Sequence, residues 1–139
     1  MTAGLRSTSV TPLSPQTAAR ELQIRRAARA DIINFTRAID VPGRPLDTED
    51  PESDSFLPAE TLMASHHVLL LNALDRVSRT PHGRLMVFMP PGSAKSTYAS
   101  VVFPARFLGQ EGGRKIILAS YGDDLARKLG RRTRSVIRQ

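Results

Sequence analysis

The sequence contains neither cysteine nor tryptophan, and aromatic residues make up only 5% of its 139 residues. The lack of cysteine excludes disulfide bonds and thiolate metal sites and fits a reducing compartment. Every apolar run is too short to span a bilayer, and the N-terminus lacks the apolar core of a signal peptide. The three histidines, His66, His67 and His82, do not have metal-ligand spacing. We therefore expect a soluble, intracellular protein with one modest aliphatic core.

Charge is unevenly distributed along the chain. Residues 1–75 hold seven basic and ten acidic side chains, whereas residues 76–139 hold thirteen basic and only three acidic ones. The second part, with a net charge of +10, should attract polyanions such as a nucleotide, a nucleic acid or an acidic partner. A solvated basic surface explains the same numbers, so charge alone leaves both interpretations open.

The most informative stretch is 84–100, which reads RLMVFMPPGSAKSTYAS. A hydrophobic run, 85–89, leads into a loop of small residues, 90–94, and then into Lys95, Ser96 and a segment that can be helical. This order predicts a phosphate-binding P-loop, in which backbone N–H groups and a helix N-terminus face phosphate oxygens. Lys95 would supply a positive charge to the β- and γ-phosphates, and the Ser96 hydroxyl would bind Mg²⁺.

The match to G-x-x-x-x-G-K-[ST] is imperfect. Met89 stands at the first glycine position and Ala94 at the second. Alanine tolerates a positive φ poorly and leaves less room for phosphate. An ordinary strand, turn and helix with Lys95 in solvent remains the alternative.

Flanking patterns predict the other elements. Residues 1–13 should form a disordered tail, and Ser14-Pro15 should begin a helix over 15–39. The acidic, proline-rich segment 41–58 predicts an exposed loop, and 59–78 a second helix.

After the loop, Pro104 should end or kink the next helix near Ser100, unless a local rearrangement accommodates its ring. Residues 116–119 then predict a buried strand, and the last helix should turn Leu129, Thr133 and Val136 inward together with Leu125. Alternation of strand and helix predicts an α/β fold with a parallel sheet.

Several features in order resemble a known family. They are the helix HVLLLNALDRVSR, the strand and loop RLMVFMPPGSAKS, the helix end FPARFLG, the strand ILASY and the helix LARKLGRRTR. Together, residues 67–138 resemble the N-terminal ATPase domain of phage large terminase subunits, the motors that drive DNA into a procapsid. The family's loops vary at both glycine positions. The resemblance implies an incomplete P-loop NTPase parallel sheet with flanking helices, preceded by a helical N-terminal region.

The resemblance also implies cofactors, site residues and partners. ATP and Mg²⁺ would be the cofactors, with Lys95 catalytic and Ser96 the Mg²⁺ ligand. The nucleotide-binding stretch would comprise Pro91, Gly92, Ser93, Ala94, Lys95, Ser96 and Thr97. Residues 56–67 occupy the region of the family's adenine contacts. Arg131 and Arg132 are candidates for an arginine finger supplied to a neighbouring subunit, and a solvated basic helix is the alternative for each.

The implied partners are double-stranded DNA, the terminase small subunit and the portal protein, in the cytoplasm of a bacterial host and without a membrane. A homo-oligomeric ring is implied only for a full-length subunit.

The sequence lacks other parts of that family's pattern. No apolar strand ending in Asp-Asp or Asp-Glu follows the loop, and no nuclease carboxylate cluster is present. Asp123 and Asp124 follow an apolar run, but helix capping explains them better.

We therefore expect a fragment with three parts: the tail 1–13, a helix and acidic loop over 14–58, and a partial ATPase domain over 59–139. It would bind ATP but need a downstream part for hydrolysis. A non-catalytic nucleic-acid- or partner-binding fragment, or an inert remnant of a terminase gene, is the alternative.

Overall fold

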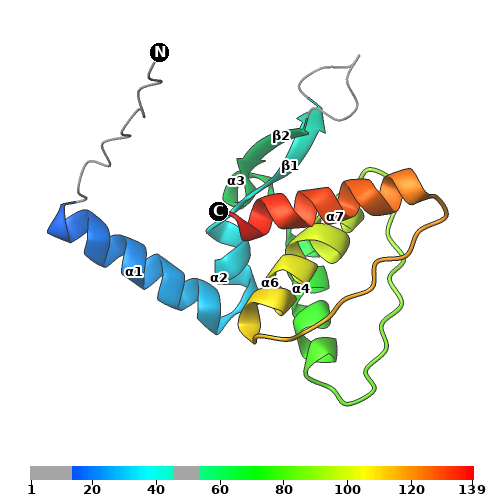
Figure 1. The fold of residues 1–139 in the computed structure, drawn as a ribbon, viewed down its shortest axis with the longest axis horizontal. Coiled ribbons are helices and arrows are strands. Elements are labelled where there is room, and N and C mark those ends of the chain that lie inside the picture. The colour runs from blue at the N-terminus through cyan, green and yellow to red at the C-terminus, as the bar shows by residue number, and fades with distance from the viewer. Residues whose placement is uncertain (1–13, 46–53) are drawn as a thin grey trace, which may run out of the picture.

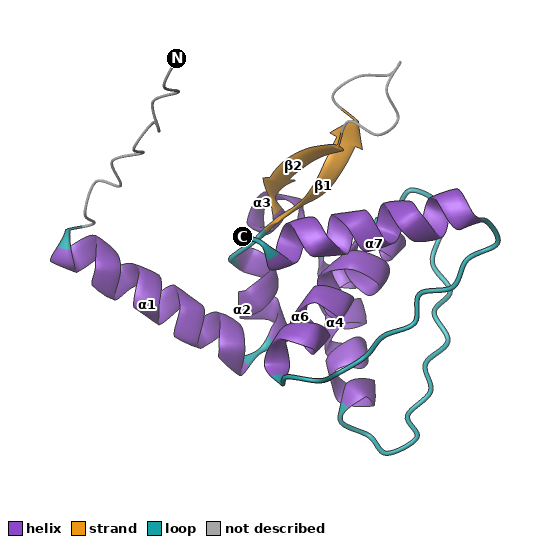
Figure 2. Ribbon diagram, in the orientation of Figure 1, coloured by secondary structure: helices purple, strands orange, loops and turns teal. Residues whose placement is uncertain are grey.

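The computed structural model describes residues 14–45 and 54–139, and these are mostly helical (Figures 1 and 2). The expected tail 1–13 and residues 46–53 of the expected acidic loop lie outside the described residues. The elements in chain order are α1 (Pro15–Ala30), α2 (Ile32–Arg37), β1 (Asp40–Pro45), β2 (Asp54–Pro58), α3 (Ala59–Leu62), α4 (Ser65–Ser78), α5 (Lys95–Thr97), the π-helical segment η1 (Tyr98–Val102), α6 (Phe103–Gln110) and α7 (Asp123–Ile137).

The N-terminal helix begins where the sequence predicted, because the Ser14 side chain accepts a hydrogen bond from the amide of Thr17 at 3.2 Å. The predicted single helix over 15–39 is nevertheless wrong. Asp31 adopts an extended conformation, ends α1, and accepts the amides of Ile33 at 2.7 Å and Asn34 at 3.2 Å to start α2. No residue of α1 is buried, and the helix extends away from the others in Figure 1.

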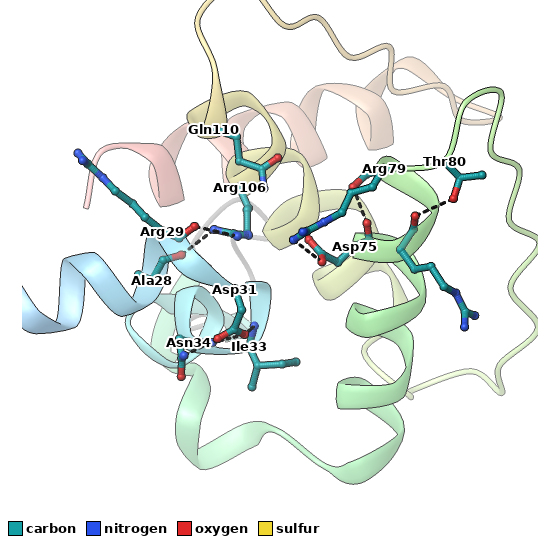
Figure 3. Close-up of polar contacts among 12 residues, drawn as sticks. Ala28, Arg29, Asp31, Ile33, Asn34, Asp75, Arg79, Thr80, Arg106 and Gln110 are labelled. Atoms are coloured by element: carbon teal, nitrogen blue, oxygen red, sulfur yellow. Dashed lines mark hydrogen bonds and ion pairs between the residues drawn. The ribbon is translucent and has the colours of Figure 1, made fainter.

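Arg106, on α6, ties α1 to the rest of the molecule. Its side chain donates to the carbonyl of Ala28 at 2.6 Å and to that of Arg29 at 3.2 Å (Figure 3). These carbonyls lie in the last turn of α1, where no intrahelical donors remain and the helix dipole favours a cation. Because Arg106 is only 5% exposed, this contact is part of the core rather than of the surface.

The only strands among the described residues form an antiparallel pair, β1 with β2, in the region where the sequence predicted a loop. Val41 pairs with Leu57 and Pro42 with Phe56, and the register shifts between Pro42 and Pro45. In a two-stranded sheet both strands are edges, so each has backbone positions that need no partner. Prolines are tolerated at such positions, which explains why the proline pattern misled the prediction.

The core lies between α2, α4, the helical run from α5 to α6, and α7. Its fully buried side chains include Ile32, Leu71, Tyr98, Val101 and Val102. The inward face predicted for the last helix is confirmed for Leu129, Thr133 and Val136, whereas Leu125 is exposed.

Pro104 neither ends nor breaks the helix that follows the loop. α5, η1 and α6 form one continuous run from Lys95 to Gln110, with the π-helical segment directly before the proline. Proline has no N–H for the carbonyl four residues earlier, which here belongs to Ser100. The Thr133 hydroxyl of α7 lies 3.3 Å from that carbonyl and 2.9 Å from the carbonyl of Leu129, so its single proton is shared between the two acceptors. The rearrangement therefore includes a replacement donor from another helix.

The expected parallel α/β sheet is wrong. Strands were predicted at 85–89 and 116–119, but the segments that contain them, 84–90 and 114–120, run extended without pairing to any strand in the described chain, and Figure 2 draws both as loops. Val87, Met89 and Leu118 pack against the core, while Phe88 and Ile117 face outward at 85% and 93% exposed. The alternation that suggests strands is present, but a strand also requires a neighbour that completes its backbone hydrogen bonds.

Candidate functional site

Loop 90–94 folds back on itself before the helix begins. The carbonyl of Pro90 accepts the Ser93 amide at 3.4 Å and the Ser93 hydroxyl at 2.7 Å. Gly92 and Ala94 have positive φ angles of 79° and 53°. The left-handed angle is natural for glycine but strained for alanine, so the conformation that Ala94 was expected to resist is the one it adopts.

A helix N-terminus follows this loop directly. Lys95 is its first residue, with Ala94 as N-cap, and the helical run continues to Gln110. The amides of the first turn have no acceptor within the helix and carry partial positive charge. Ser96 is exposed in that turn, and Thr97 is half-buried beside it. The turn therefore presents N–H groups and a hydroxyl next to the loop.

Lys95 crosses the loop instead of extending into solvent. Its Nζ donates to the carbonyl of Met89 at 3.3 Å, and the side chain is half-buried. This contact joins the residue before the loop to the residue after it, and places a positive charge among the loop's backbone groups. The alternative of a solvated lysine does not describe this geometry.

His67, near the start of α4, contacts the loop from outside. Its Nε2 lies 3.0 Å from the carbonyl of Ser93, and its Nδ1 accepts the amide of Ala64 at 3.0 Å. The ring stacks on Tyr98 with centroids 4.3 Å apart, and both side chains are buried. Burial lowers the pKa of His67, against a smaller opposing effect of its contact with Ser93, and burial raises the pKa of the Tyr98 phenol.

Sequence reasoning did not assign His67 a role at this loop. A usable signal was present, because His67 shares a helical face with Leu70, Leu71 and Leu74, all of which are buried. A histidine on that apolar face needs polar partners. Residues 56–67, expected at the adenine contacts, form β2, α3 and the start of α4, so the stretch does reach the loop through His67.

The other predicted site residues either lie outside the loop or do not form a complete site by themselves. Arg131 and Arg132 are half-buried on α7 and each contacts other residues of the chain, so their role as arginine fingers stays a prediction. Within 14–45 and 54–139, no group of three or more histidine, aspartate or glutamate side chains could hold a metal ion. The Ser96 hydroxyl stays the one metal ligand that the sequence predicts at the loop.

Comparison with known proteins found no relative of this chain. No protein-family model, curated protein or solved structure matches this chain. Among the described residues, no helix has both the length and the apolar character needed to cross a membrane.

Proposed function

We propose that loop 90–94 and the helix N-terminus after it bind the phosphates of ATP together with Mg²⁺. The observation that carries this proposal is the position of Lys95, whose Nζ folds back to the Met89 carbonyl across a loop that ends at a helix N-terminus. An oxyanion between the loop and this turn would meet backbone N–H groups and the ammonium together. The geometry supports phosphate binding without the parallel sheet that the sequence had suggested.

Each residue has a separate part in this binding. The amides of Gly92, Ala94, Lys95 and Ser96 would donate to phosphate oxygens, and the Lys95 ammonium would neutralise the β- and γ-phosphates. The Ser96 hydroxyl would complete the Mg²⁺ coordination next to the phosphates. Hydrolysis would further need a carboxylate that holds Mg²⁺ and orients water, and the sequence has no acidic motif of that kind after the loop. We therefore propose binding, without turnover, for this chain.

We also propose that the chain is part of a phage DNA-packaging motor. The resemblance of residues 67–138 to the ATPase domain of large terminase subunits supports this assignment. Double-stranded DNA, the small terminase subunit and the portal protein are then the proposed partners, and the +10 net charge of residues 76–139 suits a DNA backbone.

Titration calorimetry of the purified chain with MgATP tests the phosphate site. We expect weak binding that Lys95→Ala reduces about tenfold or more, because a charged hydrogen bond contributes about 1.5–3 kcal/mol. Lys115→Ala removes the same charge from an exposed position outside the loop and is the matched control.

Two results would contradict the proposal. If Lys95→Ala and Lys115→Ala weaken binding equally, the nucleotide responds to net charge and not to the loop. If the purified chain hydrolyses ATP and Lys95→Ala abolishes that activity, a downstream carboxylate is not required.

A further inference from the structure

We propose that His67 is a positioning residue for the phosphate loop: by donating to the Ser93 carbonyl, it turns the next amide, that of Ala94, toward the phosphate. This inference rests on the proposed function of the loop. It assigns a role to a side chain 26 residues before Ser93 in the sequence.

The argument begins with the geometry of one peptide unit. The carbonyl of Ser93 and the N–H of Ala94 belong to the same planar trans peptide, so they point in opposite directions. His67 holds the carbonyl at 3.0 Å on the side of α4 and Tyr98. The Ala94 N–H must then point away from α4. Since Ala94 is the N-cap of the helix that starts at Lys95, this N–H is directed to the side where an anion would be bound.

His67 itself is fixed from its other nitrogen. The amide of Ala64 donates to Nδ1 at 3.0 Å, so Nδ1 is the acceptor and the ring proton resides on Nε2. Nε2 is therefore a donor and suits the carbonyl of Ser93. Stacking on the buried Tyr98 restricts the rotation of the ring.

The left-handed angle of Ala94 shows why such a restraint is useful. A φ of 53° is less favourable for alanine than a right-handed conformation, so a free loop would relax and rotate the 93–94 peptide. The hydrogen bond from His67 opposes that rotation. Ser93 and Lys95 add contacts to Pro90 and Met89, but these lie within the loop and its flanks and do not anchor it to another helix.

Two variants of His67 distinguish the contribution of its hydrogen bond from that of its aromatic ring. In His67→Gln, the amide oxygen can accept from Ala64 while the NH₂ group donates to Ser93. His67→Phe keeps an aromatic ring against Tyr98 and removes both polar functions. We expect MgATP affinity within about twofold of the original for His67→Gln and about five- to tenfold weaker for His67→Phe, the loss of about one neutral hydrogen bond.

A second measurement does not depend on nucleotide. In the ¹⁵N-labelled chain, we expect NMR to find the His67 proton on Nε2. We also expect ¹⁵N relaxation to show a more mobile Ala94 amide in His67→Phe than in His67→Gln, because the peptide is no longer held.

The two proposals fail in distinguishable ways. If the original chain does not bind MgATP, the proposed function fails, and the tautomer and the mobility of the Ala94 amide still decide whether His67 holds the peptide. If the original binds MgATP and His67→Phe binds it equally well, the positioning role is wrong. If His67→Phe does not fold, a proton on Nδ1, or the loss of MgATP binding in a folded His67→Gln, overturns it.

Discussion

Ala94 and His67 both lie in environments that their residue types do not favour, and both lie at the loop. Ala94 adopts a left-handed conformation, which costs a non-glycine residue about 1–2 kcal/mol. His67 is a titratable ring inside an apolar helix face, and burial lowers its pKa. Strained backbone and perturbed pKa values concentrate at functional sites, although structural contacts also produce them.

The lowered pKa of His67 predicts that acid destabilises the protein. The unfolded chain has the ordinary pKa of about 6.5 and takes up a proton before the folded chain does, so stability rises with pH. The contribution is complete above about pH 6.5 and is lost as the pH falls through the folded pKa, with a slope of at most about 1.4 kcal/mol per pH unit for one proton. Urea unfolding between about pH 7.5 and pH 5 measures this loss, and His67→Gln should reduce it.

The control is His82→Asn, which removes an exposed histidine from a turn at a positive φ that asparagine tolerates. This variant should keep the pH dependence of the original chain. If His67→Gln and His82→Asn behave alike, His67 is not the group responsible.

At the scale of elements, the helix from Lys95 to Gln110 depends on a contact with α7. Pro104 would normally interrupt such a helix because its ring excludes the hydrogen bond to Ser100. The π-helical segment at 98–102 accommodates the ring, and the Thr133 hydroxyl, which also bonds the Leu129 carbonyl, lies 3.3 Å from the Ser100 carbonyl. The same helix begins at the loop. The packing of α7 therefore stabilises the helix whose N-terminus forms part of the proposed phosphate site.

We expect Thr133→Val to lower the free energy of unfolding by about 1–3 kcal/mol, because the partly buried Ser100 carbonyl and the Leu129 carbonyl both lose the hydroxyl while the shape is retained. In a Pro104→Ala background the loss should be smaller, since residue 104 then has an N–H for Ser100. Urea unfolding of the four proteins in this cycle measures the coupling. Additive effects would show that Thr133 does not compensate for Pro104.

For the whole molecule, the principal feature is the pair of extended segments at 84–90 and 114–120. Outward-facing Met86 and Phe88 are 78% and 85% exposed, and Ile117 on the second segment is 93% exposed. Soluble proteins rarely expose adjoining apolar side chains of this size, and unpaired backbone beside them favours association. The unpaired backbone and the exposed side chains of these two segments therefore both favour association of the chain.

We expect the purified chain to self-associate with increasing concentration and to bind the dye ANS. Phe88→Ser should reduce both while changing stability by less than about 0.5 kcal/mol, because the side chain lies in solvent. Val87→Ser changes the adjacent residue, which packs against the core, and should cost about 1–3 kcal/mol without reducing association. Sedimentation velocity and thermal unfolding measure the two effects. Equal effects of the two variants would contradict the assignment of opposite faces.

The local signals of the sequence predicted helix positions better than the sheet. Ser14 capped α1 as predicted, and the inward positions Leu129, Thr133 and Val136 were correct, because caps and helical periodicity involve residues only a few positions apart. Asp31 was overlooked as a second cap inside a periodic stretch, so one predicted helix became two. The strands were misplaced because β-pairing is decided by a partner elsewhere in the chain.

The sequence by itself determined the turn at Pro90–Ala94, the helix that starts at Lys95, and the residue types available to phosphate. Only the tertiary structure decided that Lys95 folds back to Met89, that His67 holds Ser93, and that Thr133 replaces the hydrogen bond missing at Pro104. The physical reason is the separation along the sequence over which each kind of interaction acts. Backbone propensities act over a few residues, whereas two of these three hydrogen bonds join residues 26 and 33 positions apart, which only the packing of the helices brings together.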